Sequence, residues 1–259
     1  MTVGFRGPES MTVYDEFAHF YKHGHYPEFS RRMAELLPDV LELFNARPKK
    51  ILDLACGEGT FAIALARRGF HLTGVDRSAQ MLRHARERAR RDDVMVTWRK
   101  KDMRSLSFAA EFDLVTCWFD SLNYLLDVND LCRTFAGVYR ALKNGGMFIF
   151  DMNTIHGLSV TWQRIPCVVQ TDEKNLFEIL RPEYDYESNV ATLHLTGFRK
   201  TGDSWRRMDE KHQERGYTLA QIDDCLDQAG LYKLACWGSF QDRNEPQPDS
   251  SRVWYVVGK

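Results

Sequence analysis

Between residues 50 and 152, short apolar runs alternate with stretches in which apolar residues recur every three or four positions. The short runs predict five strands, at 51–55, 70–76, 94–98, 112–118 and 147–152. The intervening stretches predict helices at 61–68, 78–91 and 130–142. Ser78 is suited to cap the second of these helices. This alternation is typical of a parallel sheet covered by helices on both faces.

After residue 152 the pattern changes to extended segments separated by turn-forming residues. Four such segments predict an antiparallel meander, at 167–171, 175–184, 190–200 and 204–215. A helix at 219–229, ended by Gly230, follows the meander. Two more strands, at 232–237 and 253–257, are expected to rejoin the main sheet.

These elements predict a doubly wound α/β fold with a seven-stranded, mainly parallel, Rossmann-like sheet and an inserted antiparallel β lobe. The expected parts are a helical cap at 1–48, a sheet domain at 49–152 and 216–259, and the lobe at 153–215. We expect the lobe to act as a lid over a substrate. In the cap, Pro38 is expected to interrupt a helix at 28–46.

The composition is that of an ordinary globular chain of 259 residues, with 35 Lys and Arg against 36 Asp and Glu. This balance argues against a protein whose main task is to bind nucleic acid phosphates. The longest apolar run, 61–66, is far shorter than the roughly 20 residues of a membrane helix, and residues 1–10 lack the features of an export signal. No two of the six cysteines form a C-x-x-C pair, so we expect reduced, buried thiols in a cytoplasmic protein.

Two glycines, Gly57 and Gly59, lie at the turn between the first predicted strand and its helix. Without Cβ atoms they let the backbone approach a ligand closely and direct N–H groups toward it. Dinucleotide-binding proteins use a similar turn, but the third glycine of their pattern is replaced here by Ala62. The turn therefore indicates a ligand site without identifying the ligand.

A carboxylate lies at the end of each of the five predicted strands: Asp53, Asp76, Asp102, Asp120 and Asp151. Ligands of open α/β sheets bind at these carboxyl ends, and Asp76 follows Gly57 by about 20 residues, the offset at which an acid binds ribose hydroxyls. Asp53 would repel a phosphate, so it suits a ligand with a cationic group such as an amino acid ammonium. Any one acid could simply cap a helix. The five together with the glycine turn favour a binding site.

Several segments together resemble the successive motifs of class I S-adenosylmethionine-dependent methyltransferases: 53–60, 76–82, 101–103, 112–115 and 142–146. The resemblance spans about residues 14–257. Four further segments are similar to small bacterial and archaeal members with an inserted β lobe, and more distantly to sugar N-methyltransferases of antibiotic pathways: 14–21, 120–124, 150–153 and 212–217. The resemblance implies S-adenosyl-L-methionine as the cofactor and a sheet whose last strand is antiparallel.

The resemblance also implies which residues hold the cofactor: Tyr14, Tyr21, Asp53, Ala55, Gly57, Gly59, Asp76, Arg77, Met81, Asp102, Met103, Trp118 and Phe119. Asp76 would bind the ribose and Asp102 the adenine amine, with Met103 beside the ring. Trp118 and Phe119 would lie by the sulfonium. The two glycines would approach the methionine part, and one of the two tyrosines would close over the cofactor.

Methyl transfer from a sulfonium is an in-line displacement, in which the protein mainly aligns the reactants and excludes water. The acceptor is predicted to be a small molecule with a nitrogen or oxygen nucleophile, whose proton a base would remove. The candidates for that base are Asp120, Tyr21 and His212, followed by His156 and Glu214. A monomer or a homodimer is expected.

Other functions are consistent with parts of the pattern. A nicotinamide-dependent oxidoreductase would share the turn and Asp76 but leave Asp53 and Asp102 unexplained. A non-catalytic scaffold that binds the same cofactor would use the lobe to recruit a partner. If RNA is the acceptor, its binding should depend steeply on salt concentration. The histidines at 19–25 lack an accompanying carboxylate or cysteine, so no metal site is predicted.

Overall fold

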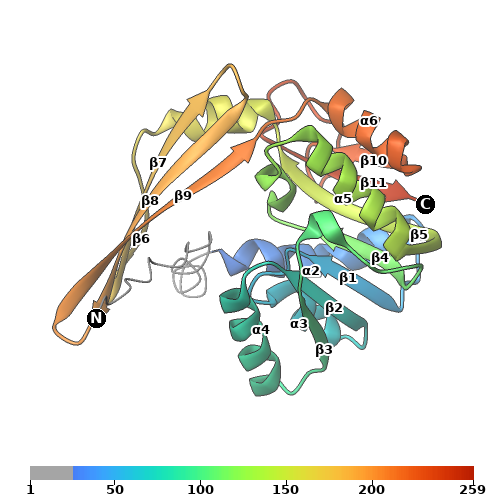
Figure 1. Cartoon of the computed structure of the whole chain (residues 1–259), viewed down its shortest axis with the longest axis horizontal. Coiled ribbons are helices and arrows are strands. Elements are labelled where there is room, and N and C mark those ends of the chain that lie inside the picture. The colour runs from blue at the N-terminus through green and yellow to red at the C-terminus, as the bar shows by residue number, and fades with distance from the viewer. Residues whose placement is uncertain (1–25) are drawn as a thin grey trace, which may run out of the picture.

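The computed structural model describes residues 26–259, and most of its strands belong to one seven-stranded sheet (Figure 1). The strands are β1 (Lys50–Leu54), β2 (His71–Asp76), β3 (Val96–Lys100), β4 (Phe112–Cys117), β5 (Leu142–Asn153), β10 (Tyr232–Trp237) and β11 (Arg252–Gly258). They lie in the order β10-β11-β5-β4-β1-β2-β3. β11 runs antiparallel to both of its neighbours, and the strands from β5 to β3 are parallel. The predicted Rossmann-like sheet with an antiparallel last strand is confirmed.

Helices cover both faces of this sheet, because successive side chains along a strand point to opposite faces. The helices are α2 (Pro27–Leu43), α3 (Thr60–Ala66), α4 (Ala79–Arg91), α5 (Val128–Ala141) and α6 (Leu219–Ala229). Ile51 packs into an apolar cluster with residues of α2 and α3, whereas Leu52 packs into a second cluster with residues of α5 and α6. Ser78 caps α4 as expected, since its Oγ accepts a hydrogen bond from the Met81 N–H.

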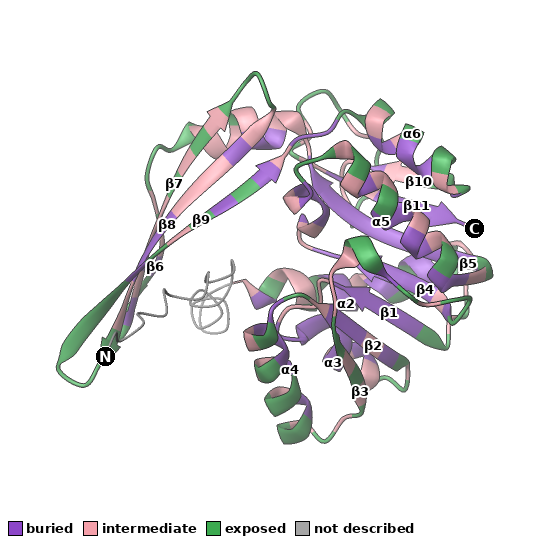
Figure 2. Cartoon of the chain, viewed as in Figure 1, coloured by how far each residue is buried: buried purple, intermediate pink, exposed green. Residues whose placement is uncertain are grey.

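The inserted lobe is a separate antiparallel sheet that extends away from the main sheet as a long curved ribbon (Figure 1). Its strands are β6 (Val168–Glu173), β7 (Leu176–Asp185), β8 (Val190–Thr201) and β9 (Ser204–Arg215), paired in chain order. Three buried apolar residues form its small core, Leu176, Leu195 and Met208. Figure 2 shows much less buried surface in the lobe than in the main sheet. Several polar residues of the lobe are nevertheless buried: Thr171, Glu178, Thr196, His212 and Glu214.

α2 does not stop at Pro38, which corrects the expected interruption. Proline lacks an N–H, so the carbonyl of Ala34, four residues earlier, loses its helical donor. Arg68 supplies a replacement: its Nη1 donates to the Ala34 oxygen at 2.6 Å. Pro38 itself lies on the exposed side of the helix. A contact between residues far apart in the chain thus allows the helix to continue.

The cysteines also differ from expectation. Cys132 of α5 and Cys225 of α6 form a disulfide, and Cys167 is exposed, so the prediction of six reduced, buried thiols is wrong for these three. The two bonded residues are 93 positions apart. Only the packing of α5 against α6 brings them together, and no local spacing could reveal it.

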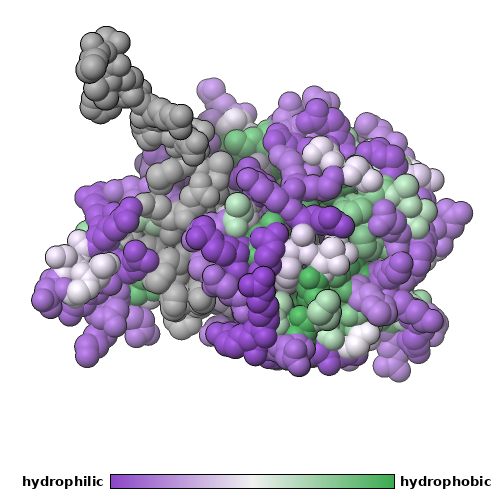
Figure 3. All heavy atoms as spheres, turned by 60° about the horizontal axis from the view of Figure 1, so that its bottom comes forward, coloured by the Kyte–Doolittle hydropathy of each residue, from purple (hydrophilic) through white to green (hydrophobic). Residues whose placement is uncertain are grey.

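The surface of the described part is mostly polar, with apolar residues gathered in one area of the face in Figure 3. Within residues 26–259, every helix is too short or too polar to cross a bilayer.

Candidate active site

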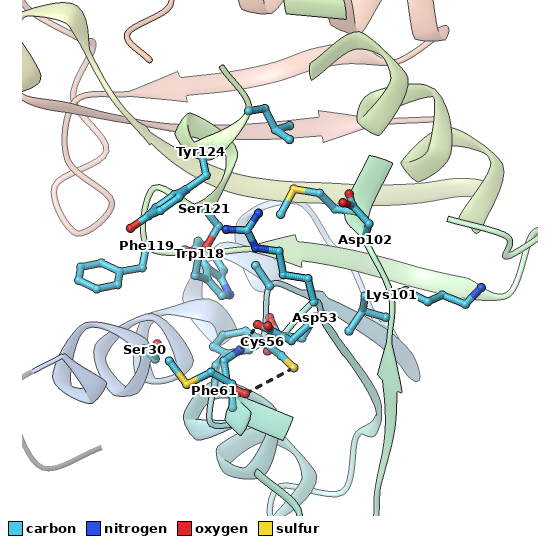
Figure 4. Close-up of a pocket in the computed structure, with 18 of the residues that line it drawn as sticks. Ser30, Asp53, Cys56, Phe61, Lys101, Asp102, Trp118, Phe119, Ser121 and Tyr124 are labelled. Atoms are coloured by element: carbon cyan, nitrogen blue, oxygen red, sulfur yellow. Dashed lines mark hydrogen bonds between the residues drawn. The ribbon is translucent and has the colours of Figure 1, made fainter. Parts of the chain in front are cut away.

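A pocket opens at the carboxyl ends of β1, β2 and β4 (Figure 4). Ten of the thirteen residues expected to hold the cofactor line it: Asp53, Ala55, Gly57, Asp76, Arg77, Met81, Asp102, Met103, Trp118 and Phe119. The other lining residues are Ser30, Cys56, Phe61, Val75, Lys101, Arg104, Ser121, Tyr124 and Leu125. Tyr14 and Tyr21, together with the histidines at 19–25, lie outside the described residues.

The two glycines of the turn have different surroundings. Gly57 has a positive φ of 54°, and a Cβ at this position would meet nothing within 4 Å. Gly59 has a φ of 82°, and a Cβ there would lie 2.5 Å from Cη2 of Trp98 in β3. Gly57 therefore exposes its backbone to the pocket, whereas Gly59, which is not among the lining residues, lets Trp98 pack against the turn.

Backbone donors hold the Asp76 carboxylate at the end of β2. Its Oδ2 accepts from the Gly57 N–H and its Oδ1 from the Ser78 N–H, both at 2.8 Å. Burial raises its pKa, and these hydrogen bonds act in the opposite sense. Each carboxylate oxygen keeps a lone pair for a further donor, which suits the two hydroxyls of a ribose.

A neighbouring arginine holds Asp102 in place. Arg104 Nη2 lies 2.6 Å from Asp102 Oδ2, and Arg104 Nη1 reaches Asp130 of α5 at 2.8 Å. The hydrogen bond from Arg104 lowers the pKa of Asp102. Asp102 is therefore ionised and fixed in position at one end of the pocket, with Met103 next to it.

Asp53 is buried at the end of β1 and has no cation within ion-pair distance in the described part of the chain. Its Oδ1 accepts a hydrogen bond from the Thr116 hydroxyl at 3.0 Å. Burial raises its pKa to about 8, the bond from Thr116 opposes this rise, and the charge of Asp76 adds to it. A buried carboxylate without a cation that lines a pocket favours a ligand with its own positive charge.

Aromatic side chains form the opposite end of the pocket. Trp118 packs between Phe61 and Phe240, with ring centroids 5.4 Å and 5.6 Å away. Phe119 lies 4.9 Å from Phe29 of α2. In Figure 4, Phe119 and Tyr124 occupy one end of the group of side chains, and Lys101 and Asp102 the other.

The backbone after β4 is left-handed at two successive residues, Phe119 (φ 59°) and Asp120 (φ 52°). This conformation is costly for residues other than glycine. The Asp151 carboxylate compensates, because it accepts from the N–H of Phe119 at 2.6 Å and from that of Asp120 at 3.0 Å. Asp151 therefore shapes the wall of the pocket and is not one of its lining residues.

Asp120 belongs to a buried polar cluster next to this turn and does not line the pocket. Its Oδ2 accepts from Asn153 at 2.7 Å and from Arg252 at 3.1 Å. Arg252 also pairs with Asp151, and its guanidinium lies 5.8 Å from the Phe119 ring centroid. Glu214 joins through Asn153 at 2.8 Å, and burial and the charge of Asp120 raise its pKa strongly. Sequence reasoning missed Arg252 and Asn153, whose pairing between β11 and β5 is a tertiary feature.

His212 lies on β9 of the lobe and contacts the pocket through one residue. Its Nδ1 is 3.0 Å from the hydroxyl of Tyr124, which lines the pocket. Its Nε2 is 3.3 Å from Oε2 of Glu210. His156, at the start of the segment that leads to the lobe, does not line the pocket. Within residues 26–259, no group of three or more His, Cys, Asp or Glu side chains is arranged to hold a metal ion.

Comparisons with known proteins agree with this site. A model of the methyltransferase domain family matches residues 51–146, the segment that contains most of the pocket. A putative methyltransferase of Geobacillus sp. (strain WCH70) is 32% identical over 213 residues, which cover 82% of the chain and 85% of that protein. The chain belongs to the class I S-adenosylmethionine-dependent methyltransferases.

Solved structures similar to this methyltransferase include its lobe. An S-adenosylmethionine-dependent methyltransferase from Clostridium acetobutylicum is 26% identical, with a TM-score of 0.82 over 95% of the chain and 99% of that structure. An amino pentose methyltransferase of Micromonospora echinaspora, solved with S-adenosylmethionine bound, shares the fold at 19% identity, with a TM-score of 0.69 and coverage of 97% and 98%. The cofactor of this family is S-adenosylmethionine, so the oxidoreductase alternative is not supported.

Proposed function

We propose that this methyltransferase binds S-adenosylmethionine in the pocket and transfers its methyl group to the nitrogen or oxygen of a small molecule. The observation that carries the cofactor site is the Asp53 carboxylate, buried and without a cation in the described part of the chain. It would attract the cationic ammonium of the cofactor's methionine part. Asp76 would bind the ribose and Asp102 the adenine amine, while Trp118 and Phe119 would border the sulfonium.

The acceptor would enter at the aromatic end, between the main sheet and the lobe. The position of Tyr124 next to lobe residue His212 supports this placement, as does the likeness of the whole chain, lobe included, to an amino pentose methyltransferase. In this proposal the lobe, 153–215, is a substrate lid and the helical part before residue 49 is a cap. The cytoplasmic location and the monomeric or homodimeric state stay predictions.

The test uses S-adenosylmethionine labelled in its methyl group together with a small-molecule cell extract. We expect label in a small product. Label found only in protein or RNA would refute the small-molecule proposal, and no transfer to any fraction would favour a non-catalytic role.

Asp76→Ala tests the pocket in a calorimetric measurement of S-adenosylmethionine binding. This variant removes the partner of the Gly57 N–H as well as the proposed ribose ligand, so cofactor affinity should fall at least about tenfold, a loss of roughly 1.4 kcal/mol. Asp172→Ala, an exposed lobe position, is the control and should bind normally. Unchanged cofactor binding by Asp76→Ala, measured by calorimetry, would contradict the assignment.

A further inference from the structure

A chain of three side chains connects the acceptor end of the pocket to the lobe. Tyr124 belongs to the short turn η2 (Ser121–Tyr124) and lines the pocket. Its hydroxyl contacts Nδ1 of His212 at 3.0 Å, and Nε2 of the same ring lies 3.3 Å from Glu210 Oε2. The phenol, the imidazole and the carboxylate are thus in series, and only the phenol reaches the pocket.

The surroundings of His212 favour one arrangement of its protons. The ring is 4% exposed and lies at 87° to the Tyr124 ring. Among residues 26–259, two acids lie near it: Glu210 on its own strand and Glu178 of β7. The Glu178 carboxylate accepts from Tyr26 at 2.7 Å and from Thr171 at 3.1 Å. A carboxylate next to Nε2 favours the proton on that nitrogen, which leaves Nδ1 with a lone pair for the Tyr124 O–H. Tyr124 is therefore positioned to lose its proton to His212.

We propose that Tyr124 is the catalytic base toward the methyl acceptor, and that His212 and Glu210 are positioning residues that draw the proton away. The inference rests on the proposed function and specifies its acceptor as a neutral amine or a hydroxyl that carries a proton. Bound S-adenosylmethionine supplies an electrophilic methyl group whose carbon–sulfur electron pair stays on sulfur. The acceptor's lone pair forms the new bond to carbon.

The three side chains Tyr124, His212 and Glu210 account for the proton that the acceptor loses. The acceptor proton passes to the Tyr124 oxygen as the phenol proton moves to Nδ1 of His212. The positive charge that the sulfonium loses then rests on the imidazolium, which the Glu210 carboxylate stabilises until the proton leaves to water.

The first test measures the ring protons directly and needs no acceptor. NMR of protein labelled with ¹⁵N-histidine should show neutral His212 with its proton on Nε2, the signal being assigned by its loss in His212→Asn. Tyr124→Phe and Glu210→Gln should each shift this signal. A proton on Nδ1 in the neutral ring would overturn the proposal, whether or not methyl transfer is found.

The second test measures single-turnover methyl transfer into the extract acceptor. Tyr124→Phe should lower the rate by about 10²- to 10⁴-fold, with the S-adenosylmethionine dissociation constant within about threefold of wild type. If Tyr124, His212 and Glu210 act as a unit, adding His212→Asn to Tyr124→Phe should cost little more.

His194 provides the matched control, since its Nε2 lies 3.0 Å from Glu183 of the neighbouring strand, without a phenol at the pocket. His194→Asn should leave the rate of methyl transfer unchanged. A Tyr124→Phe rate within threefold of wild type would refute the base. Failure of the wild type to label any small molecule would refute the proposed function instead, while the NMR result still decides the arrangement of His212.

Discussion

At the residue scale, the buried Asp53 carboxyl of the proposed cofactor site lowers the stability of the ligand-free protein at neutral pH. The folded protein keeps a proton on this carboxyl up to about pH 8, whereas an unfolded chain releases it near pH 4. Between these values the folded state holds the additional proton, so the free energy of unfolding falls as pH rises from about 4 to 8. A cationic ligand would remove this penalty by pairing with the ionised form.

Asp53→Asn should therefore stabilise the ligand-free protein while it weakens cofactor binding. Asparagine keeps the acceptor for Thr116 and never ionises. The gain should increase from pH 5 to pH 8 and reach at least about 1 kcal/mol, or roughly 2–4 °C in thermal midpoint. Thermal unfolding across this range measures the first effect and calorimetry with S-adenosylmethionine the second.

Asp113→Asn is a control for which we expect the opposite change in stability. Lys143, 2.6 Å away, and two backbone N–H groups hold the pKa of Asp113 below its usual value, although burial opposes them. Its ionised form therefore stabilises the fold at neutral pH, and the substitution should lower the midpoint there. A pH-independent difference between Asp53→Asn and wild type would contradict the interpretation of Asp53.

At the element scale, the two glycines of the turn between β1 and α3 have different roles: Gly59 allows Trp98 to pack closely, and Gly57 lines the pocket. Gly59→Ala would force a Cβ toward Trp98 at a positive φ, so we expect a destabilisation of about 1–3 kcal/mol. Gly57→Ala meets no protein atom and should cost less stability, yet it should weaken cofactor binding because its Cβ faces open space at the pocket. Denaturant unfolding with parallel calorimetry separates the two, and equal stability of both variants would contradict this division.

The bond between α5 and α6 gives a second prediction at this scale. Thiol titration of the denatured, unreduced protein should find four free cysteines, and six after reduction. Because the bond closes a long loop, its reduction should cost about 2–4 kcal/mol of stability. Cys132→Ser should show five thiols and lose the sensitivity to reductant, and six thiols before reduction would refute the bond.

Local chemistry explains which elements could be predicted from the sequence. Helix α6 was predicted to the residue, because Thr218 and Gln221 form a capping box at its start and Gly230 adopts a φ of 81° at its end. The lobe strands follow from the turn residues between them. β5, by contrast, starts at Leu142 instead of residue 147, and α2 passes through Pro38. In α2 the decisive partner, Arg68, is distant in sequence and could not be inferred.

Some residues of the candidate site could likewise be predicted from the sequence, and others could not. Strand-end acids and the glycine turn are visible in the sequence, because the carboxyl ends of parallel strands converge on one edge, and most of them line the pocket. Arg252 and the pairing of Tyr124 with His212 depend on how β11 and the lobe fold back on the sheet. The roles of Asp120 and Asp151 depend on the backbone after β4, where two successive residues are left-handed. Neither of these residues is a glycine, so the sequence gives no sign of this conformation.

At the scale of the whole molecule, ligand binding should stabilise the complete fold, because the pocket includes residues from β1, β2, β4 and the segments that follow them. A ligand at 100 times its dissociation constant adds about 2.7 kcal/mol, which should raise the thermal midpoint by roughly 5–10 °C. We expect this with S-adenosylmethionine and S-adenosylhomocysteine and not with NAD or NADP. At the same ligand concentration, Asp76→Ala should reduce the shift to about half or less. A shift with a nicotinamide alone would contradict the cofactor assignment.

The position of β11 within the sheet determines when the sheet can be completed during synthesis of the chain. This strand lies between β5 and β10, although it is made after every other strand of the sheet. A nascent chain that ends before residue 252 would hold six of the seven strands with a gap between two of them, and it would lack the arginine that pairs with Asp120 and Asp151. The sheet therefore cannot close before residues 252–258 have left the ribosome, and until then β5 and β10 have open edges. Until β11 pairs with them, the unpaired edges of β5 and β10 make this the most aggregation-prone stage of folding.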